Sequence, residues 1–390
     1  MKKKIAILGS TGSIGTTSLN IFKKKSSYFK IEVLSANKNY KKILYQIKKF
    51  KPNFFIVTNN NIFLKIKRKL KNNKTKIINS YKALKFSKKK LDITIAAIPG
   101  LIGLEPTIKF TKISKKILLA NKESIICGWD IIKKTANKNN TKIIPLDSEH
   151  FSIYKLVENY EDKEIDRIYI TASGGPFLNL AMNKFKNIKP SDALKHPKWS
   201  MGKKISIDSA TLMNKVLELI EAQKIFNFDK KKYHIVIHPQ SLVHAIVKFK
   251  NGITKLLYHE PNMMIPISNA IFNSNLNINN FSKSKNLNNG IDDLNFQKVD
   301  AKRFPIIKII PKLNQYQSTP IIINAVNEIL IDHFLKRKIS FNSISKYLFK
   351  VLKDKNYKKY AIKNSKNLKN IYIIDQWSRG KILEILKENK

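Results

Sequence analysis

The sequence predicts an α/β protein with an N-terminal doubly wound parallel sheet, a central α+β unit and a C-terminal helical unit. Three observations support this prediction. Up to residue 150, short and nearly continuous apolar runs alternate with longer lysine-rich segments of helical character, as expected for a parallel sheet covered on both faces. Almost every unusual polar loop follows the end of one of these runs. Beyond residue 300, several segments space their apolar residues as helices do.

Six apolar runs predict the strands of the N-terminal sheet. They are Lys4–Gly9, Ile31–Ala36, Phe54–Thr58, Ile93–Ile98, Ile117–Ala120 and Lys142–Leu146. Open parallel sheets bind ligands at the edge where their strands end. The polar loops fall at that edge, whereas random polar loops would fall at both edges. We therefore expect residues 1–146 to form one Rossmann-like domain with a ligand site along this edge.

The chain changes character after this domain, and we divide the remainder into three parts. They are a mixed α+β unit (147–271), an asparagine-rich linker (272–300) and a small helical domain (301–390). The mixed unit contains candidate strands at 165–172, 234–237 and 244–249 and a helix near 209–226. A hydrophilic segment within it, residues 185–203, is expected to be a mobile lid.

Length and composition limit the class of protein. A chain of 390 residues is longer than one hydrophobic core usually supports, so two or three domains are expected. No uninterrupted apolar run reaches the roughly 18 residues that a membrane span needs, and the run Ile5–Leu8 is too short for a signal peptide. The single cysteine, Cys127, fits a reducing compartment. These features predict a cytoplasmic protein with no membrane partner.

The net charge of +48 taken alone suggests a nucleic-acid partner. The composition argues against a specific one. Lysine supplies nearly all of the charge, with only five arginines, whereas arginine is the residue that reads bases bidentately. Lysine, asparagine and isoleucine are abundant even in plain stretches such as Lys65–Lys76, as drift in an AT-rich genome would produce. We therefore expect no specific nucleic-acid binding, only non-specific association with polyanions at low salt.

The segment Gly9-Ser-Thr-Gly-Ser-Ile-Gly15 follows the first strand and opens a helix. Its glycines permit a tight turn, and the helix N-terminus offers free N–H groups to a pyrophosphate. An ordinary glycine-rich turn is the alternative, but the position after the first strand favours a dinucleotide. The second strand ends in Asn37-Lys38-Asn39, without the acid that usually binds the ribose of NAD. Lys38 suits a 2′-phosphate, so NADPH is favoured over NADH, although it is also one lysine among many.

Three carboxylates are candidates for a divalent metal. Asp147 and Glu149 lie two residues apart at a strand end, where both side chains can point the same way. Glu218 lies far off in sequence, on a predicted helix. Carboxylate oxygens with open positions suit Mg²⁺ or Mn²⁺. A surface acid pair is the alternative, but the chain has only 27 acidic residues.

The same helix carries polar groups suited to a phosphorylated substrate. Asn214 and Lys215 share a face with Glu218, although an ordinary surface ion pair between Lys215 and Glu218 is an equally good interpretation. Asp208 or Ser209 is expected to cap the N-terminus of this helix.

Two further segments carry hydroxyl, imidazole and indole groups. Ser173-Gly-Gly-Pro follows a predicted strand, and His196-Pro-Lys-Trp199 lies in the predicted lid. Trp199, in a hydrophilic segment, is expected to be a lid residue rather than a core residue. His196 is a candidate site residue only because of the residues around it, since a lone histidine is more often structural. His238 and His244 are interpreted as mainly structural.

Taken together, these segments resemble the motifs of the 1-deoxy-D-xylulose 5-phosphate reductoisomerase family. The matching motifs are Gly-Ser-Thr-Gly-Ser-Ile-Gly, Ala-Asn-Lys-Glu, Leu-Asp-Ser-Glu-His, Ala-Ser-Gly-Gly-Pro-Phe, His-Pro-Lys-Trp-Ser-Met-Gly, Lys-Ile-Ser-Ile-Asp-Ser-Ala-Thr-Leu-Met-Asn-Lys, His-Pro-Gln-Ser and Asn-Ala-Val-Asn-Glu. They occur in family order from residue 9 to residue 328, so the resemblance covers nearly the whole chain. Any one motif is modest evidence, but the ordered set is highly specific.

The resemblance implies an enzyme that rearranges deoxyxylulose phosphate to a branched aldehyde and reduces it with NADPH. The product would be 2-C-methyl-D-erythritol 4-phosphate, on the non-mevalonate route to isoprenoids. The metal, Mg²⁺ or Mn²⁺ with Co²⁺ as an alternative, would polarise the substrate carbonyl and stabilise the enolate-like charge. The resemblance further implies a homodimer in the bacterial cytoplasm, a hinged lid and a C-terminal helical domain.

The resemblance also assigns roles to individual residues. The metal would be held by Asp147, Glu149 and Glu218, and the substrate phosphate by Ser173, Ser209, Asn214 and Lys215. His196 and Trp199 would close over the substrate, and Lys122 and Ser148 would reach its hydroxyl end. The NADPH site would be lined by Thr11, Gly12, Ser13, Ile14, Asn37, Lys38, Asn39, Asn121 and Glu123, with Gly202 near the nicotinamide.

Two departures from the family pattern stand out. Asn37 replaces the usual glycine, which predicts a stiffer ribose-phosphate loop. The segment His259-Glu-Pro-Asn262-Met-Met264 replaces a Gly-x-Pro-Asp-Met-Arg pattern, which puts a local ion pair or the dimer contact in question but leaves the chemistry unaffected.

Two rival functions remain. A plain NADPH-dependent reductase of another phosphorylated or amino-acid-derived carbonyl compound would need the glycine loop but would have no use for three metal-binding carboxylates. A basic nucleic-acid-binding protein would bind tightly at physiological salt without depending on Asp147 or Glu149.

Overall fold

The computed structural model describes residues 1–71, 73–84, 91–199, 201–281 and 293–388. The chain forms two compact units. The first comprises Met1–Ser124, Ile131–Phe151 and Asn262–Gly290, and the second comprises Ile125–Asp130, Ser152–Pro261 and Ile291–Lys390. The predicted lid and linker each include residues outside the described ranges, namely Ser200 and 282–292. The predicted domain boundaries stay predictions.

The first unit is built on a seven-stranded parallel sheet of order β4-β3-β2-β1-β5-β6-β7. Its strands are β1 (Lys3–Leu8), β2 (Phe29–Ala36), β3 (Phe54–Val57), β4 (Lys76–Ile78), β5 (Leu91–Ala96), β6 (Ser114–Leu119) and β7 (Lys142–Pro145). The six predicted strands are confirmed to within a few residues. The sequence missed β4, because a strand of three residues gives no usable apolar run.

The strand order reverses between β1 and β5, and ligands of open α/β sheets bind outside the strand ends at such a point. The loops that follow these two strands touch. A Cβ placed on Gly9 would lie only 2.8 Å from the carbonyl carbon of Ala97, and the φ of Gly9 is +82°. Only glycine fits this position, so the first glycine of the motif closes the two loops against each other.

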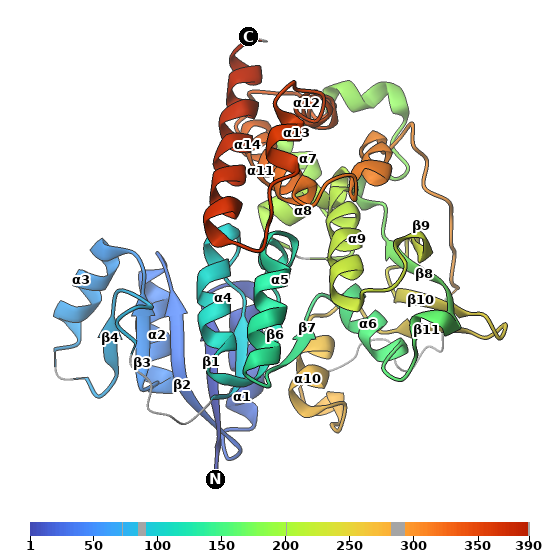
Figure 1. Cartoon of the computed structure of the whole chain (residues 1–390). Coiled ribbons are helices and arrows are strands. Elements are labelled where there is room, and N and C mark those ends of the chain that lie inside the picture. Colours follow the sequence, from blue (N-terminus) through green and yellow to red (C-terminus); the bar gives the residue numbers. More distant parts are fainter. Residues whose placement is uncertain (72, 85–90, 200, 282–292, 389–390) are drawn as a thin grey trace. The chain divides into compact units, whose positions relative to one another are not determined.

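Helices cover both faces of the sheet, with α4 in front of the strands and α1 behind them (Figure 1). The helices of this unit are α1 (Ser13–Lys24), α2 (Tyr40–Phe50), α3 (Asn60–Lys69), α4 (Leu104–Thr111), α10 (Met264–Phe272) and most of α5 (Lys122–Lys138). Asparagines cap three of them, since the side chains of Asn39, Asn59 and Asn121 accept an N–H from the first turns of α2, α3 and α5.

The second unit contains a mixed four-stranded sheet of order β11-β10-β8-β9. Its strands are β8 (Ile165–Ala172), β9 (Tyr233–Ile237), β10 (Val243–Phe249) and β11 (Thr254–Tyr258). β8 and β9 are parallel, and the other pairs are antiparallel. The three predicted strands are confirmed, and β11 completes a hairpin after the turn at Gly252.

The helices of the second unit lie between and after these strands. They are α6 (Ser148–Leu156, which begins in the first unit), α7 (Pro190–Ala193), α8 (Lys203–Ala210), α9 (Met213–Phe226), α11 (Thr319–Leu335), α12 (Ser343–Val351), α13 (Tyr357–Ala361) and α14 (Leu368–Glu388). Short 3₁₀ helices span Gly175–Phe177, Met182–Asn187 and Pro305–Lys312. The predicted C-terminal helical segment is therefore confirmed, with α11 and α14 as its longest members.

The single helix expected near 209–226 is two helices. Leu212, with a φ of +66°, separates α8 from α9. The prediction that Asp208 or Ser209 caps this helix is wrong, because both lie in the last turn of α8 and no side chain caps α9. The apolar spacing runs on through the break, so the sequence did not show it.

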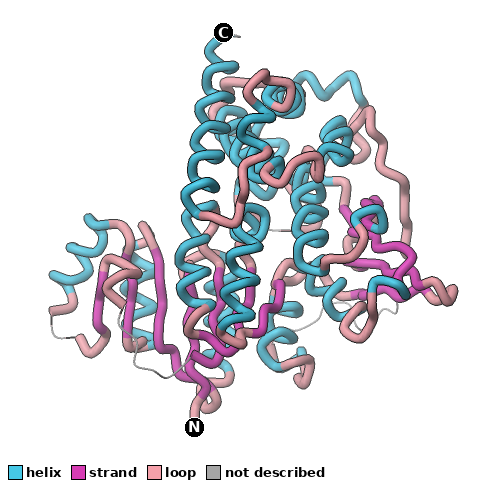
Figure 2. Tube along the Cα trace, in the orientation of Figure 1, coloured by secondary structure: helices cyan, strands magenta, loops and turns pink. Residues whose placement is uncertain are grey.

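The end of the predicted linker is tied to the second sheet. Gln297 forms a β-bridge with Ile237, and the ring of Phe296 stacks on His238 at 4.8 Å. From there the chain runs as a long loop to the C-terminal helices (Figure 2).

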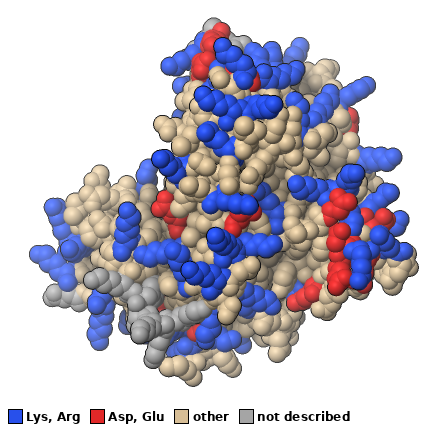
Figure 3. Space-filling view, viewed as in Figure 1, with Lys and Arg blue, Asp and Glu red and all other residues tan. Residues whose placement is uncertain are grey.

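The positive charge is spread over the visible surface, as expected from the composition. Lysine and arginine side chains are scattered over the visible face, while acidic residues gather in small groups (Figure 3). Among the described residues, no helix is both long and apolar enough to cross a bilayer.

Candidate active site

The glycine loop presents an open helix N-terminus at the end of β1. Gly12 caps α1 without a side-chain acceptor, so the first N–H groups of this helix have no partner within it. A Cβ on Gly12 would meet only the carbonyl oxygen of Gly9, at 3.4 Å, whereas a Cβ on Gly15 would lie 2.6 Å from the Cα of Ser10. Gly15 is thus needed for packing, while Gly12 leaves space beside the free N–H groups. This cradle fits a pyrophosphate.

The loop after β2 lies at the same sheet edge. Asn39 accepts the N–H of Lys42 and caps α2, and the amide of Asn37 donates to the hydroxyl of Thr58 at 2.8 Å. The side chain of Lys38 is exposed. Asn37 and Asn39 thus fix the loop, which leaves Lys38 available for a charged group at this edge.

Asn121 has a structural use that the sequence did not reveal. It is 2% exposed. Its side chain accepts the N–H of Ser124 and donates to the carbonyl oxygens of Ile98 and Gly100. Asn121 therefore shapes the loop after β5 that faces the glycine loop. Glu123, in the first turn of the same helix, is also buried.

The first unit contributes an acid pair after β7. Asp147 lies in the turn, and Glu149 lies in the first turn of α6, with carboxylate oxygens within 4.8 Å of each other. The two side chains are brought together by this strand-to-helix turn rather than by the alternation of a strand. Lys122 forms an ion pair with Asp147, and Ser148 donates to Glu149 at 2.7 Å. Four of the predicted site residues therefore meet here.

His150 is a neighbour to which the sequence assigned no role. It is fully buried, and its Nδ1 lies 3.6 Å from the carboxylate of Asp147. Its place in Leu-Asp-Ser-Glu-His was the only available signal. An imidazole beside the acid pair restricts the orientation of Asp147.

The second unit brings together the loop after β8 and the end of α8. Gly175 has a φ of +66°, and a Cβ there would lie 2.9 Å from the carbonyl oxygen of Ser209 and 3.1 Å from the Cα of Ala210. This close backbone contact places the Ser173 loop directly against Ser209. Asn214 and Lys215 follow in the first turn of α9, so the four predicted phosphate ligands belong to adjoining segments.

Glu218 lies on α9 with the two partners predicted for it. Lys215 Nζ lies 2.6 Å from one carboxylate oxygen, and the amide of Asn214 donates to the other. Glu218 is 1% exposed, so this is a buried cluster and not a surface ion pair. The Oδ1 atom of Asn214 is buried and has no hydrogen-bond partner among the described residues. A buried acceptor in this position fits a hydroxyl-bearing ligand.

The tautomer of His196 follows from its contacts. Its Nδ1 accepts the N–H groups of Lys198, at 3.2 Å, and Trp199, at 2.9 Å, so the ring proton is on Nε2. That atom lies 3.1 Å from Ser173 Oγ. Burial, and then the charge of Lys215, lower the pKa of His196 to about 4. His196 is therefore a neutral donor directed at the Ser173 hydroxyl.

The other histidines of this unit support the backbone. His238 Nε2 accepts the N–H groups of Leu242 and Val243, while Nδ1 contacts the carbonyl oxygen of Asn295 at 2.9 Å. His244 lies 6.0 Å from the Trp199 ring, edge to face, so it helps to seat that indole. The structural interpretation of His238 is confirmed, while His244 also contacts a candidate site residue.

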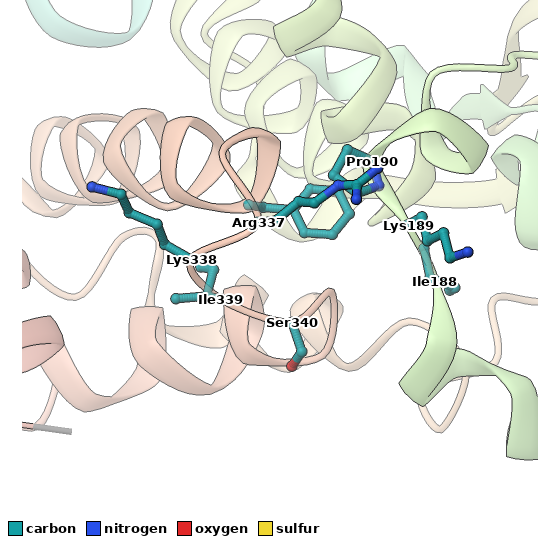
Figure 4. Close-up of a pocket in the computed structure, with 8 residues that line it drawn as sticks. Ile188, Lys189, Pro190, Arg337, Lys338, Ile339 and Ser340 are labelled. Carbon is teal, nitrogen blue, oxygen red and sulfur yellow. The ribbon is translucent and has the colours of Figure 1, made fainter. Parts of the chain in front are cut away.

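Two pockets flank the segment between Ile188 and Pro197. One is lined by Ser173, Gly175, Pro176, Phe177, Leu178, Asn179, Leu180, Asp192, Lys195, Pro197 and Pro239, and it therefore joins a predicted phosphate ligand to the predicted lid. The other lies between residues 188–190 and 334–340, with Arg337 reaching toward Pro190 (Figure 4).

Three family models match most of the chain. The family model described as 1-deoxy-D-xylulose 5-phosphate reductoisomerase matches residues 5–128, and that of its C-terminal domain matches residues 143–226. A further model, of the DXP reductoisomerase C-terminal domain, matches residues 259–381.

Relatives with that name extend over the full length. The protein of Pelagibacter ubique is 48% identical over 385 residues, covering 97% of this chain and 98% of its own. That of Halothermothrix orenii is 36% identical over 388 residues, covering 99% of each chain.

Solved structures of this family have the same fold as this chain. A crystal structure of DOX-P reductoisomerase in complex with NADPH, fosmidomycin and magnesium has a TM-score of 0.90 at 30% identity, covering 99% of this chain and 98% of that one. The enzyme of Zymomonas mobilis in complex with NADPH has a TM-score of 0.86 at 28% identity, covering 99% of each chain. These matches confirm the predicted fold class and the resemblance drawn from the ordered motifs, and the chain belongs to the 1-deoxy-D-xylulose 5-phosphate reductoisomerase family.

Proposed function

We propose that this chain rearranges and reduces 1-deoxy-D-xylulose 5-phosphate to 2-C-methyl-D-erythritol 4-phosphate, in non-mevalonate isoprenoid biosynthesis. The observation that carries the proposal is the buried cluster of Asn214, Lys215 and Glu218, which lies beside the Ser173 and Ser209 segments. A plain reductase has no need for a buried carboxylate next to a phosphate-binding group. The full-length relatives support the same function.

We assign the metal to Asp147, Glu149 and Glu218. Carboxylate oxygens are ligands that Mg²⁺ and Mn²⁺ prefer, with Co²⁺ as an alternative. Each half of this donor set fits a cation, because an ammonium group pairs with Asp147 in one unit and with Glu218 in the other. The bound ion would act as a Lewis acid on the substrate carbonyl. Lys122 and Ser148, both bonded to these carboxylates, would hold the hydroxyl end of the substrate.

The phosphate would bind among Ser173, Ser209, Asn214 and Lys215. Lys215 supplies the positive charge, and the two serines supply hydroxyl donors. As oriented, Asn214 Oδ1 can only accept, so it suits a substrate hydroxyl, and a turn of the amide would present its N–H₂ group to the phosphate.

His196 would act as a neutral donor from the lid. Its Nε2–H points at Ser173 Oγ, which is itself a proposed phosphate ligand, so an arriving phosphate oxygen can replace that hydroxyl as acceptor. Trp199, two peptide bonds beyond Pro197, would cover the substrate and exclude water.

NADPH would lie along the carboxyl edge of the seven-stranded sheet. Its pyrophosphate would bind at Thr11, Gly12, Ser13 and Ile14, and its 2′-phosphate at Asn37, Lys38 and Asn39. Asn121 and Glu123 would line the site from α5, and Gly202 would approach the nicotinamide. The cofactor would supply the hydride for the reduction.

We further propose a homodimer that works in the bacterial cytoplasm. β11 is an edge strand with exposed apolar side chains, since Leu256 and Tyr258 are 43% and 38% exposed. An unpaired edge of this kind can be covered by a second copy. Light scattering after gel filtration would test this, because a mass near one chain would refute it. Leu256→Lys should shift the mass toward one chain, since a charge on the apolar edge opposes pairing.

The direct test is NADPH oxidation followed by absorbance with deoxyxylulose phosphate and Mg²⁺ or Mn²⁺. Turnover should stop with a chelator, return with added metal and be much slower with NADH. Turnover that survives chelation would favour a plain reductase. A loss of NADPH binding would point to the glycine loop, whereas NADPH binding without turnover would point to the metal or phosphate assignment.

A further inference from the structure

A buried residue of α11 contacts α8, the helix that carries Ser209. The amide of Asn327 donates to Asp208 Oδ1 at 2.6 Å, and both residues are 1% exposed. The other carboxylate oxygen of Asp208 accepts from Lys204, at 3.1 Å. Asp208 is thus held at both oxygens, and Asn327 is a partner that lies on another helix.

The position of α8 controls the spacing of two proposed phosphate ligands. Ser209 directly follows Asp208, and its carbonyl oxygen packs against Gly175, where not even a Cβ would fit. Gly175 in turn donates its N–H to Ser173 Oγ at 3.1 Å. The two backbones are in close contact at this point, so a small shift of α8 changes the separation of the Ser209 and Ser173 hydroxyls.

The loop that carries Ser173 is also anchored on the C-terminal segment. Arg303 donates to the carbonyl oxygens of Phe177 and Leu180, both at 2.7 Å. The Phe177 ring meets Phe341 edge to face at 5.2 Å. This side is fixed through Arg303 and Phe341, and the hydrogen bond between Asn327 and Asp208 ties α8 to α11.

We propose that Asn327 is a positioning residue for the phosphate subsite. Its hydrogen bond to Asp208 holds α8 in the position where Ser209 and Ser173 can both bind the same phosphate group. The inference rests on the proposed role of Ser209 and adds to it a buried determinant on α11. The Asn327 amide can donate to Asp208, whereas a carboxylate at 327 would face the Asp208 carboxylate with like charge.

The experiment compares Asn327→Leu, which has similar volume but no donor, with the parent enzyme. The expected result is a KM for deoxyxylulose phosphate raised at least tenfold, with kcat changed less than threefold. The inhibition constant of inorganic phosphate should rise by the same factor as KM, whereas the NADPH dissociation constant should stay unchanged. The exchange variant Asn327→Asp with Asp208→Asn restores the hydrogen bond with its direction reversed, so it should bring KM back to within about threefold of the parent.

Two control variants separate positioning from other causes. Glu328→Gln lies next to Asn327 on α11 and breaks the ion pair with Arg379, so it should lower the melting temperature without raising KM. Ser209→Ala tests the proposed ligand directly. If Ser209→Ala leaves KM unchanged, Ser209 is not a phosphate ligand, and the positioning role of Asn327 is refuted as well. If Ser209→Ala raises KM but Asn327→Leu does not, or the exchange variant fails to rescue KM, the positioning role alone is refuted.

Discussion

Glu218→Gln is the substitution that tests the site most directly, because it keeps the shape of the side chain and removes its charge. Glu218 is buried with Lys215 Nζ at 2.6 Å. If it is a metal ligand, the loss of the negative charge should lower kcat/KM by at least 1,000-fold, which corresponds to about 4 kcal/mol of transition-state stabilisation. The assay is NADPH oxidation at saturating Mg²⁺, with NADPH binding measured separately and expected to be unchanged.

The same substitution should also destabilise the metal-free protein. Asn214 and Lys215 donate to different oxygens of Glu218. A glutamine offers only one oxygen, so it keeps one of these bonds and turns an N–H₂ group toward the other donor. The loss of charge assistance and of one acceptor should cost about 1.5–3 kcal/mol. For a unit of this size the melting temperature falls by roughly 2–4 °C per kcal/mol, which gives a decrease of about 3–12 °C. Calorimetry in the presence of a chelator would measure it. Adding Lys215→Met should recover most of this stability, since a buried ion pair can be replaced by apolar groups, but should restore no activity.

Glu32→Gln is a matched control. Glu32 is likewise buried and bonded to one amide and one ammonium group, those of Asn53 and Lys30, but it lies away from the proposed site. Glu32→Gln should lower the melting temperature and leave turnover intact. If Glu218→Gln stays within about tenfold of the parent (about 1.4 kcal/mol), Glu218 is not a metal ligand. If its melting temperature equals that of the parent, the pair of Lys215 and Glu218 does not stabilise the metal-free protein.

Three further predictions address the cofactor and the lid. Gly9→Ala should abolish folded protein, because the new Cβ would collide with the loop after β5 at a positive φ. Gly12→Ala should fold normally and weaken NADPH binding at least tenfold. Circular dichroism would measure folding and fluorescence titration NADPH binding, and equal effects of the two variants would contradict the pyrophosphate cradle assigned to the glycine loop. Lys38→Ala should reduce the ratio of kcat/KM for NADPH over NADH by about tenfold (about 1.4 kcal/mol), and an unchanged ratio would place the 2′-phosphate elsewhere. The pKa of His196 is about 4 in the folded protein, below its ordinary value of about 6.5, so the stability gained from the neutral ring is complete above pH 6.5 and is lost as the pH falls toward 4. Over this range the melting temperature of the parent should therefore fall more steeply with pH than that of His196→Gln. Parallel curves for the two proteins would show that the ring is not held neutral.

The sequence predicted the seven-stranded sheet well because its strands are buried on both faces. Such strands are continuous apolar runs, as in Ile31–Ala36, and their polar loops all fall at one edge. β4 was not predicted because it has only three residues, and β11 was not predicted because its residues alternate between exposed and half-buried, so it has no buried apolar run. The division between α8 and α9 was missed because it depends on the φ of a single leucine.

The residue types of the candidate site were readable from the sequence, but their contacts were not. Asn214, Lys215 and Glu218 could be grouped because a helix has a known period. The link between Gly175 and Ser209 depends on tertiary packing, as does the contact between Asn327 and Asp208, residues 119 positions apart. Asn121 was expected at the cofactor, and its bonds to the loop after β5 could be known only once that loop was placed.

The asparagines that cap α2, α3 and α5 show how a biased composition can be accommodated. Asparagine is among the best N-cap residues, and it also tolerates left-handed backbone, which Asn140, Asn227 and Asn273 adopt. Lysines fill the last turns of α1, α2 and α3, where a positive charge is favoured. Many asparagines and lysines of this biased composition therefore lie at helix ends, where both residue types are stabilising.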